Sequence, residues 1–292
     1  MDQKYTEMNK RLNKSRPIYV LGLPRSGSTW VSKAISMGAE RRIVHEPFNW
    51  LRYPERIKYH MKYLRADAND QDLINILVQA SKPTIPFTDF LIRNSGILIK
   101  DVHICLAVEY ISKIFNPHIV ILIRHPCAMA QSWKRMNLEI PFRIETLLSQ
   151  DSLVKDFLEP FSKHLKSRDD YFFSFGGYWG ASYYVMWKLT QQHPEWVWAN
   201  HDDLCINPIE KFSSLLQNLG IQPTTRGYNR LDKFLSKNNA VQRKKDGPHS
   251  VRRLTNEEPD KWKEILQPED IKAIFDGAAP FENLLSFFKY NR

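Results

Sequence analysis

The sequence runs Pro17-Ile-Tyr-Val-Leu-Gly-Leu-Pro-Arg-Ser-Gly-Ser-Thr-Trp30 near its N-terminus, and this is the most informative stretch of the 292-residue chain. Its first half is a short apolar run, which predicts a buried strand because it is too brief for a helix. Pro and Gly then break the run, and residues 28–35 resume with apolar positions at helical spacing. A strand, a Gly-containing loop and a helix N-terminus bind phosphate well, because free backbone N–H groups and the helix dipole converge there.

The spacing within this loop narrows the kind of phosphate compound. Gly22-x-x-x-x-Gly27-x-Thr29 fits the P-loop of nucleotide triphosphatases except where that loop carries Lys, because this chain has Ser28. The cation lies inside the loop instead, as Arg25. A nucleotide kinase or NTPase is the alternative function on this fold, but it needs the missing Lys and a carboxylate that holds Mg²⁺.

The run Leu-Pro-Arg25-Ser-Gly-Ser-Thr-Trp30 resembles the 5′-phosphosulfate loop of sulfotransferases that use 3′-phosphoadenosine 5′-phosphosulfate (PAPS). The resemblance implies that Arg25 offers its planar fork of donors to the phosphosulfate. It also implies that the tryptophan stacks on adenine, although packing in the core is the alternative. The other donor-binding residues implied by the resemblance are Ser26, Gly27, Ser28 and Thr29, and helix capping is an alternative role for the last two.

A second element of the same family follows the apolar run His118-Ile-Val-Ile-Leu-Ile123. Arg124 closes this predicted strand, and Ser132 lies eight positions later on the predicted helix. This arrangement resembles the 3′-phosphate element of the family, since a 3′-phosphate is bound by a bidentate cation and a hydroxyl donor. A weaker resemblance links Arg252 or Arg253 to the cation of the family's C-terminal loop, with a solvated basic loop as the alternative.

A general base must take the proton of the sulfuryl acceptor. Glu46, in His45-Glu46-Pro47-Phe48, is the leading candidate, because it resembles the Glu-Pro position of carbohydrate sulfotransferases. His45 is an alternative base, and so is His103 in Lys100-Asp101-Val102-His103. This last segment departs from the family patterns, but Lys100 fits as a cation on the bridging oxygen of the phosphosulfate.

The candidate residues share a position relative to the strands. Arg25, Glu46, Lys100, Arg124 and Asp202 all come just after predicted strands. In open parallel sheets the ligand binds outside the carboxyl ends of the strands, so one cleft is expected. The segment around Asp202 resembles the family's segment after the fourth strand, except that a histidine at 201 replaces the tyrosine, which weakens an adenine contact there.

The alternation of strands and helices predicts an α/β fold, a single P-loop-like domain whose central, mostly parallel sheet has helices on both faces. Strands are expected over 18–23, 96–100, 118–123 and 196–200, and 42–50 is expected to be a short strand that ends in a polar loop. Helices are expected over 105–115, 128–136, 178–192 and 208–219. Two surface helices are expected within 54–82. Residues 1–16 form a basic N-terminal arm and 17–292 the sulfotransferase domain, with 137–176 as a possible cap or mobile segment and 242–256 as a basic loop.

The composition agrees with an anionic partner. The net charge is +10, which a doubly phosphorylated donor, a sulfated or uronic-acid acceptor, or nucleic acid would match. Nucleic acid is the weaker choice, because the sequence has no zinc spacing, RNA-binding aromatic signature or basic recognition helix. A non-catalytic binder of anionic polymer is the remaining alternative. Three widely spaced cysteines predict reduced thiols and a cytoplasmic protein, and neither a signal peptide nor a membrane span is expected.

These observations together predict transfer of the sulfuryl group from PAPS to a hydroxyl or amine, leaving adenosine 3′,5′-bisphosphate (PAP), without a metal. The Glu46-Pro47 resemblance and the aromatic segment 171–187 favour a carbohydrate or glycolipid acceptor, with a small metabolite as the alternative. The oligomeric state is left open.

Overall fold

The computed structural model describes residues 16–82, 96–138, 141–239 and 259–290, without the side chains of 141–142 and 237–239. Its centre is a five-stranded sheet in the order β2-β3-β1-β4-β5, and every pair is parallel. The sequence predicted a mostly parallel sheet, and the observed one is parallel throughout. The strands are β1 (Ile18–Leu21), β2 (Arg42–His45), β3 (Ile97–Asp101), β4 (His118–Ile123) and β5 (Val197–Asn200).

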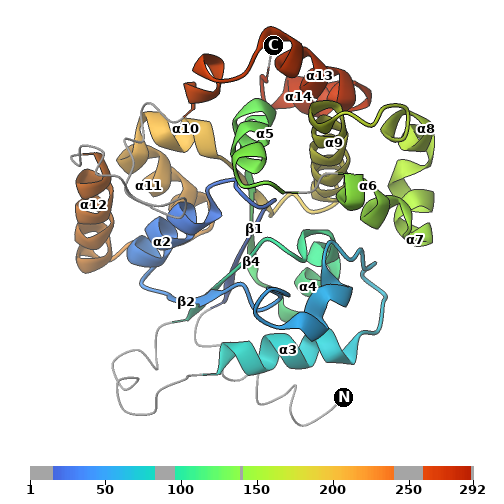
Figure 1. Ribbon diagram of the computed structural model, residues 1–292. Helices are drawn as coiled ribbons and strands as arrows, with labels where there is room; N and C mark the ends of the chain where they lie inside the picture. The colour runs from blue at the N-terminus through green and yellow to red at the C-terminus, as the bar shows by residue number, and fades with distance from the viewer. Residues whose placement is uncertain (1–15, 83–95, 139–140, 240–258, 291–292) are drawn as a thin grey trace.

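Alternate residues of each strand point to opposite faces, and each face has its own hydrophobic core. In β1, Ile18 and Val20 pack under helices that lie together on one side of the sheet in Figure 1. Tyr19 and Leu21 pack under the helices of the other side. The layer over Ile18 and Val20 contains α2 (Ser28–Ala39), α10 (His201–Ile206), α11 (Pro208–Asn218) and α12 (Thr225–Asn239). The layer over Tyr19 and Leu21 contains α3 (Gln71–Ser81), η2 (Cys105–Ala107), α4 (Val108–Phe115), α5 (Pro126–Arg135), α9 (Tyr171–Thr190), α13 (Pro268–Ala278) and α14 (Glu282–Phe287).

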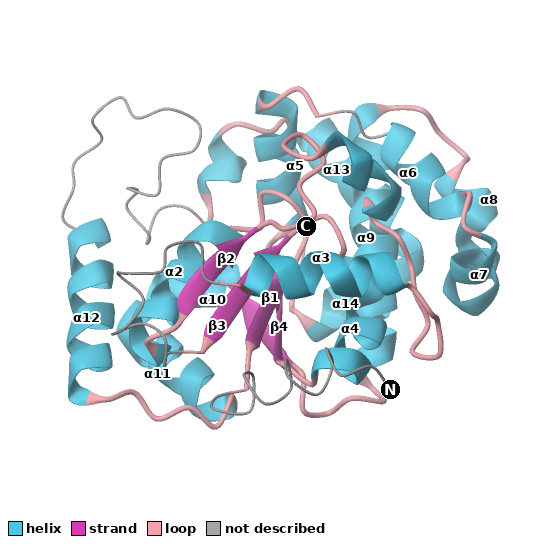
Figure 2. Ribbon diagram, turned by 90° about the horizontal axis from the view of Figure 1, so that it is seen from below, coloured by secondary structure: helices cyan, strands magenta, loops and turns pink. Residues whose placement is uncertain are grey.

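The view from below shows this arrangement along the sheet, with α2, α10, α11 and α12 on one side and α4, α9 and α14 on the other (Figure 2). Three helices of these layers, α10, α12 and α14, were not predicted from the sequence, whereas a helical pattern was expected after the basic loop, where α13 lies. Of the two helices expected within 54–82, one is a short 3₁₀ helix, η1 (Pro54–Tyr59), and the other is α3.

Helix α9 begins at Tyr171, seven residues before the start expected from the sequence. Asp170 caps it, since its carboxylate accepts a hydrogen bond of 2.9 Å from the N–H of Phe173. The helix is buried nearly all round, so its sequence has no amphipathic period that marks an end. The segment before α9 contains α6 (Pro141–Leu148), α7 (Asp151–Leu153), the π-helical turn η3 (Val154–Leu158), η4 (Glu159–Phe161) and α8 (Ser162–Leu165). Two 3₁₀ helices, η6 (Lys261–Glu264) and η7 (Ala279–Phe281), flank α13.

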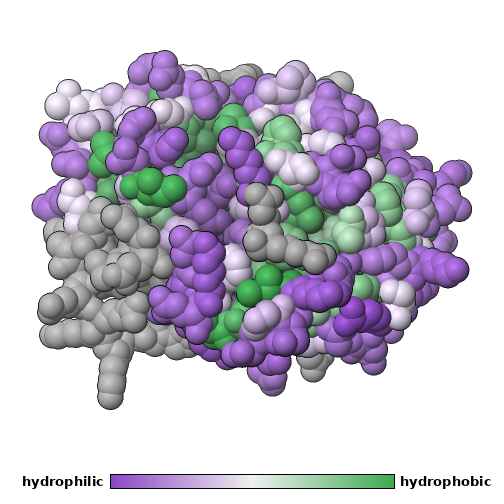
Figure 3. All heavy atoms as spheres, turned by 90° about the horizontal axis from the view of Figure 1, so that it is seen from above, coloured by the Kyte–Doolittle hydropathy of each residue, from purple (hydrophilic) through white to green (hydrophobic). Residues whose placement is uncertain are grey.

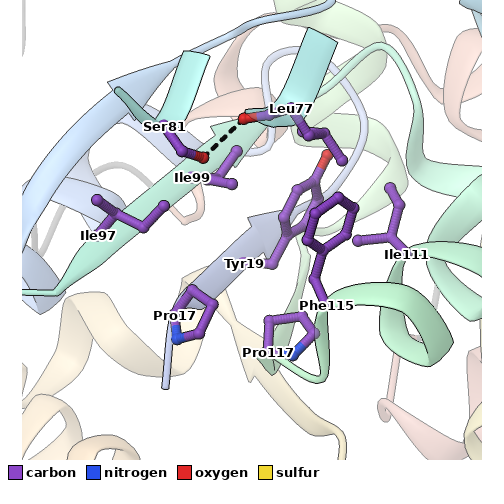
Figure 4. A pocket seen from close by; sticks show the side chains of 9 residues that line it. All are labelled: Pro17, Tyr19, Leu77, Ser81, Ile97, Ile99, Ile111, Phe115 and Pro117. Carbon is purple, nitrogen blue, oxygen red and sulfur yellow. Dashed lines mark hydrogen bonds between the residues drawn. The ribbon is translucent and has the colours of Figure 1, made fainter. Parts of the chain in front are cut away.

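A small cavity lies at the amino ends of β1 and β3, opposite the ends that carry the candidate residues. Its volume is about 10 Å³, near the lower limit for one water molecule, and nearly all of its lining is apolar. Figure 4 shows Tyr19 and Phe115 within it, while the hydroxyl of Ser81 is bonded to the carbonyl of Leu77. This cavity is therefore a packing gap of the core and not a ligand site.

Candidate active site

The residues predicted to form the site lie side by side where the strands of the sheet end. Because all five strands are parallel, their carboxyl ends meet at the same edge. Across the sheet, Glu46 follows β2, Lys100 is the last residue but one of β3, the loop with Arg25 follows β1, Arg124 follows β4, and Asp202 follows β5. The phosphate loop is thus central, between the candidate bases on one side and the second cationic element on the other.

The loop itself has the backbone of a phosphate cradle. Arg25 and Gly27 both adopt positive φ angles, of 71° and 90°. A Cβ at Gly27 would lie 2.2 Å from Cδ2 of His201, so only glycine fits there. Helix α2 starts at Ser28, with Gly27 as its N-cap and no side-chain cap. The suggested capping role of Ser28 and Thr29 is therefore wrong, and within the described chain the first-turn N–H groups have no cap that would compete with a ligand.

Three side chains from distant segments hold the loop, and the sequence did not identify any of them. The indole Nε1 of Trp133 donates to the carbonyl of Pro24 over 2.7 Å, and the hydroxyl of Tyr183 accepts from the N–H of Leu23 over 3.3 Å. The thiol of Cys105 donates to the carbonyl of Gly22 over 3.2 Å. All three are buried. Only the aromatic enrichment of α9 and the position of Trp133 next to Ser132 could have suggested them.

The two predicted donor-binding elements are in direct contact. Nε of Arg25 donates to the hydroxyl of Ser132 over 3.0 Å, and Nη1 of Arg124 donates to the carbonyl of Arg25 over 3.3 Å. These residues are about a hundred positions apart in the chain. The fold therefore joins the phosphosulfate loop to the Arg124–Ser132 element, which the sequence could only describe separately.

Trp30, the candidate for adenine stacking, packs in the core. It is buried, and its ring contacts His201 and Phe212 edge-on, with centroids 5.7 and 5.2 Å away. His201 therefore supports both Trp30 and Gly27, and its position is structural. Adenine stacking on Trp30 stays a prediction.

The candidate bases form one cluster around the carboxylate of Glu46. This carboxylate forms an ion pair with Lys100, which is only 2% exposed, and accepts a hydrogen bond of 2.9 Å from Asn49. Nε2 of His103 lies 3.9 Å and Nδ1 of His45 lies 3.8 Å from it. Burial raises the pKa of Glu46, but the nearby His103 and the charge of Lys100 outweigh burial, so this pKa lies far below its ordinary value.

Asp101 positions this cluster, and the sequence analysis missed it. Its carboxylate is completely buried and accepts hydrogen bonds from the N–H of Phe48 over 2.8 Å and of His103 over 2.7 Å. One side chain at the end of β3 thus ties the loop that carries Glu46 to the turn that carries His103. Burial raises the pKa of Asp101 although its two hydrogen bonds and nearby cations oppose that rise.

A histidine and an arginine extend the cluster away from the phosphate loop, and neither was predicted. The ring of His60 lies 5.7 Å from that of His103. Arg143 of α6 donates from Nη1 to Nε2 of His60, and its guanidinium lies 5.8 Å from the ring of Trp133. Arg143 therefore stands between the base cluster and the tryptophan that holds the phosphate loop.

At the other end of the edge, Asp202 joins two strand ends. Its carboxylate accepts from the N–H of His125 over 3.0 Å, and its own N–H donates to the side chain of Asn200 over 3.0 Å. The predicted cations Arg252 and Arg253 lie outside the described residues. Within the described parts of the chain, no group of three or more His, Cys, Asp or Glu residues is placed to hold a metal ion. Nor does any described helix have the length and apolar character to cross a membrane.

Comparison with known proteins supports the fold. No protein-family model and no curated protein matches the sequence. Among solved structures, the sulfotransferase domain from the curacin biosynthetic pathway aligns with a TM-score of 0.52 at 16% identity, over 94% of this chain and 97% of that one. The sulfotransferase domain from the Synechococcus PCC 7002 olefin synthase gives a TM-score of 0.46 at 17% identity, over 94% and 95% of the two chains. Mouse sulfotransferase SULT7A1 complexed with PAP gives 0.45 at 14%, over 100% and 91%. On the first of these alignments, which agrees with the parallel sheet and its central phosphate loop, the chain has the sulfotransferase fold.

Proposed function

We propose that this protein is a PAPS-dependent sulfotransferase. The observation that carries the proposal is the contact between Arg25 and Ser132, which joins the phosphosulfate loop to the element predicted to bind the 3′-phosphate. PAPS has phosphate groups at both ends of its ribose, so one molecule can reach both elements only if they adjoin. The free N–H groups at the start of α2 and the two arginines supply the donors that such a ligand needs.

The residues around the loop have distinct roles in this reaction. Arg25 and the N–H groups of residues 27–29 stabilise the charge that develops on the bridging oxygen as its bond to sulfur breaks, and Lys100 adds a buried cation nearby. The N–H of Ser26 is not among these donors, because it donates to the carbonyl of Leu23 over 3.2 Å. Arg124 and Ser132 hold the 3′-phosphate. The acceptor oxygen forms the new bond to sulfur, and its proton goes to a base of the protein.

His103 is the better base, and Glu46 is its partner. A carboxylate whose pKa is strongly lowered is a weak proton acceptor, and that of Glu46 is occupied by Lys100 and Asn49. Nε2 of His103 faces this carboxylate, while its Nδ1 is buried and has no hydrogen-bond partner in the described chain. We assign proton uptake to Nδ1 of His103, with Glu46 stabilising the imidazolium.

The acceptor in this proposal is a carbohydrate, a glycolipid or a small metabolite with a hydroxyl or amine group. The reaction takes place in the cytoplasm. Three free, buried cysteines support a reducing compartment.

The first test of the proposed function is donor binding followed by transfer. Calorimetry should show binding of PAP, and incubation with PAPS labelled in its sulfuryl group should label at least one acceptor among sugars, lipids and amines. Arg25→Ala/Arg124→Ala should lose both. Absence of PAP binding, with thermal stabilisation by ATP and Mg²⁺ instead, would replace the proposal by the nucleotide kinase or NTPase.

Replacement of the proposed base tests this assignment. His103→Gln should lower kcat by about 10²–10⁴-fold while the affinity for PAP stays unchanged, because the general base is lost. A kcat that His103→Gln leaves unchanged would return the role to Glu46.

A further inference from the structure

Arg143 is a half-buried cation that has no counter-ion among the described residues, and it lies beside the proposed catalytic cluster. No carboxylate of the described residues is within ion-pair distance of its guanidinium, whose contacts are the ring nitrogen of His60 and the face of Trp133. Its Nε is buried and has no hydrogen-bond partner there. A guanidinium removed from water without a carboxylate is costly, so a position of this kind favours an anion from outside the chain.

The contact with Arg143 determines which nitrogen of His60 carries the proton. A guanidinium only donates hydrogen bonds, so Nε2 of His60 accepts and the ring proton is on Nδ1. The pKa of His60 is lowered to about 3 by burial and then by the charges of Arg143 and His103, so the ring is neutral near pH 7. Its Nδ1–H is a buried donor that lacks an acceptor in the described chain. Arg143 and His60 therefore present unused donors together.

The neighbouring charges do not neutralise this pair. Of the two carboxylates of the cluster, that of Glu46 is already paired with Lys100 and hydrogen-bonded to Asn49, and that of Asp101 accepts two backbone hydrogen bonds. The cation of Arg143 thus remains in excess next to the neutral imidazole of His60. The rings of His60 and His103 have centroids only 5.7 Å apart. An acceptor whose anionic group binds Arg143 and His60 would therefore place a hydroxyl, a few bonds along the same molecule, against His103.

We propose that Arg143 and His60 bind an anionic group of the acceptor, of the carboxylate type, and thereby select hydroxy acids or uronic acids for sulfation. This inference rests on the proposed function where sulfuryl transfer is measured, and it narrows the class of acceptor. The same cation could instead contact the sulfuryl group of the donor, since Trp133 also holds the phosphate loop at Pro24. The experiment must therefore separate acceptor binding from donor binding.

The test uses matched acceptors that differ only in charge, each with labelled PAPS: 4-hydroxyphenylacetate and its methyl ester, 3-hydroxybutanoate and its methyl ester, and glucuronate and glucose. The proteins are the wild type, Arg143→Leu, Arg143→Lys and the control Arg230→Leu, which removes an exposed arginine of α12 on the other face of the sheet. The affinity for PAP is measured for each by calorimetry. Binding of each acid and neutral partner is measured by ligand-observed NMR in the presence of PAP.

The wild type should prefer the charged member of a pair by about 10–100-fold in kcat/KM, as expected for one hydrogen-bonded ion pair. Arg143→Leu should abolish this preference by raising KM for the acid, while PAP affinity and the rate with the neutral member stay unchanged. Arg143→Lys keeps the positive charge and should restore part of the preference. It therefore keeps the test valid if the leucine variant does not fold. Arg230→Leu should match the wild type.

Several results would overturn the inference. Equal use of charged and neutral acceptors by the wild type is one, and a loss of PAP affinity in Arg143→Leu is another, since it moves the arginine to the donor site. If no acceptor is sulfated, NMR decides: acids that bind more tightly than esters in the wild type but not in Arg143→Leu support the anion site, and equal binding rejects it. Failure of PAP to bind any variant would count against the proposed function alone, because the acid and ester titrations can be repeated without PAP.

Discussion

At the residue scale, Glu46 shows how the fold concentrates charge at one point. Its φ angle is 45°, an unusual value for a residue with a side chain, and its N–H donates to the carbonyl of Lys100 over 2.7 Å. The backbone contact and the ion pair with the same lysine both hold the carboxylate at the end of β3. Strained backbone of this kind persists where the surrounding contacts impose it, and such positions cluster at functional sites.

The ion pair predicts a pH-dependent contribution of Glu46 to stability. Because the folded pKa is depressed, this contribution is complete above the ordinary value of about 4.5 and is lost as the pH falls toward the folded pKa. Glu46→Gln leaves Lys100 buried and unpaired, which should lower the free energy of unfolding by about 3 kcal/mol near pH 7. Urea unfolding between about pH 3 and pH 7 should show this difference shrinking below about pH 4.5. A difference that is constant with pH would contradict the ion pair.

Arg25 combines a functional cation with strained backbone. Arg25→Gly should reduce turnover by about 10²–10³-fold, since it removes a donor to the transferring group. The melting temperature should not fall, because glycine relieves the positive φ of 71°, which costs roughly 1–2 kcal/mol in other residues. The matched control is Lys289→Gly, which changes an exposed cation with a φ of 56° and should leave turnover unchanged. Loss of activity accompanied by unfolding of Arg25→Gly would refute this separation of roles.

At the scale of elements, α9 and α13 pack with their backbones in near contact. A Cβ at Gly277 would lie 2.0 Å from the carbonyl oxygen of Phe173, and a Cβ at Gly176 would lie 2.0 Å from that of Ile274. Glycine is required at both positions because the opposing atoms belong to backbone and cannot rotate away. The crossing fixes α9, which supplies the tyrosine that holds the phosphate loop.

Gly277→Ala should therefore destabilise the protein by about 1–3 kcal/mol, the usual cost of overpacking a tight interface. Thermal unfolding would measure the loss, and kcat should fall little at temperatures where the variant is folded. Glu269→Ala, at an exposed position of the same helix, serves as the control and should change stability by no more than about 0.5 kcal/mol. An unchanged melting temperature for Gly277→Ala would mean that the two helices lie further apart than described.

At the scale of the whole molecule, the chain is strongly basic, and the face seen in Figure 3 is mostly hydrophilic. The net charge is +10, and the face viewed from above in Figure 3 carries hydrophobic side chains only in small separate groups where it is not covered in grey. Such a charge raises the local concentration of anionic ligands before they bind.

The affinity for PAP should therefore fall with ionic strength. Raising NaCl from about 0.05 to 0.5 M shortens the Debye length from above 10 Å to below 5 Å, so the dissociation constant of PAP should increase severalfold. Calorimetry at several salt concentrations measures it, with uncharged adenosine as the control ligand. A PAP affinity that does not respond to salt would show that its phosphates are not bound by charge.

Much of this architecture could be predicted because its signals are local. The strand His118–Ile123 was predicted with its observed ends, since a continuous apolar run bounded by Asn-Pro and by Arg-His-Pro is typical of a buried parallel strand. The phosphate loop was recognisable from eight consecutive residues. The start of α9 was not, because a helix buried on all sides has no polar face to delimit it.

The sequence by itself determined the sulfotransferase fold, the phosphate loop and the identity of the cations that follow the strands, since each depends on neighbouring residues. Only the tertiary structure decided which of these residues meet. The contact of Arg25 with Ser132 and the position of Arg143 against His60 join segments 107 and 83 residues apart. No periodicity or motif records such contacts, because they arise from the order of the strands and the packing of helices on them. The proposed donor site could be anticipated, because its residues belong to two local motifs. Asp101, which holds the candidate bases, and Arg143, which is proposed to select the acceptor, belong to no motif and became visible only in the fold.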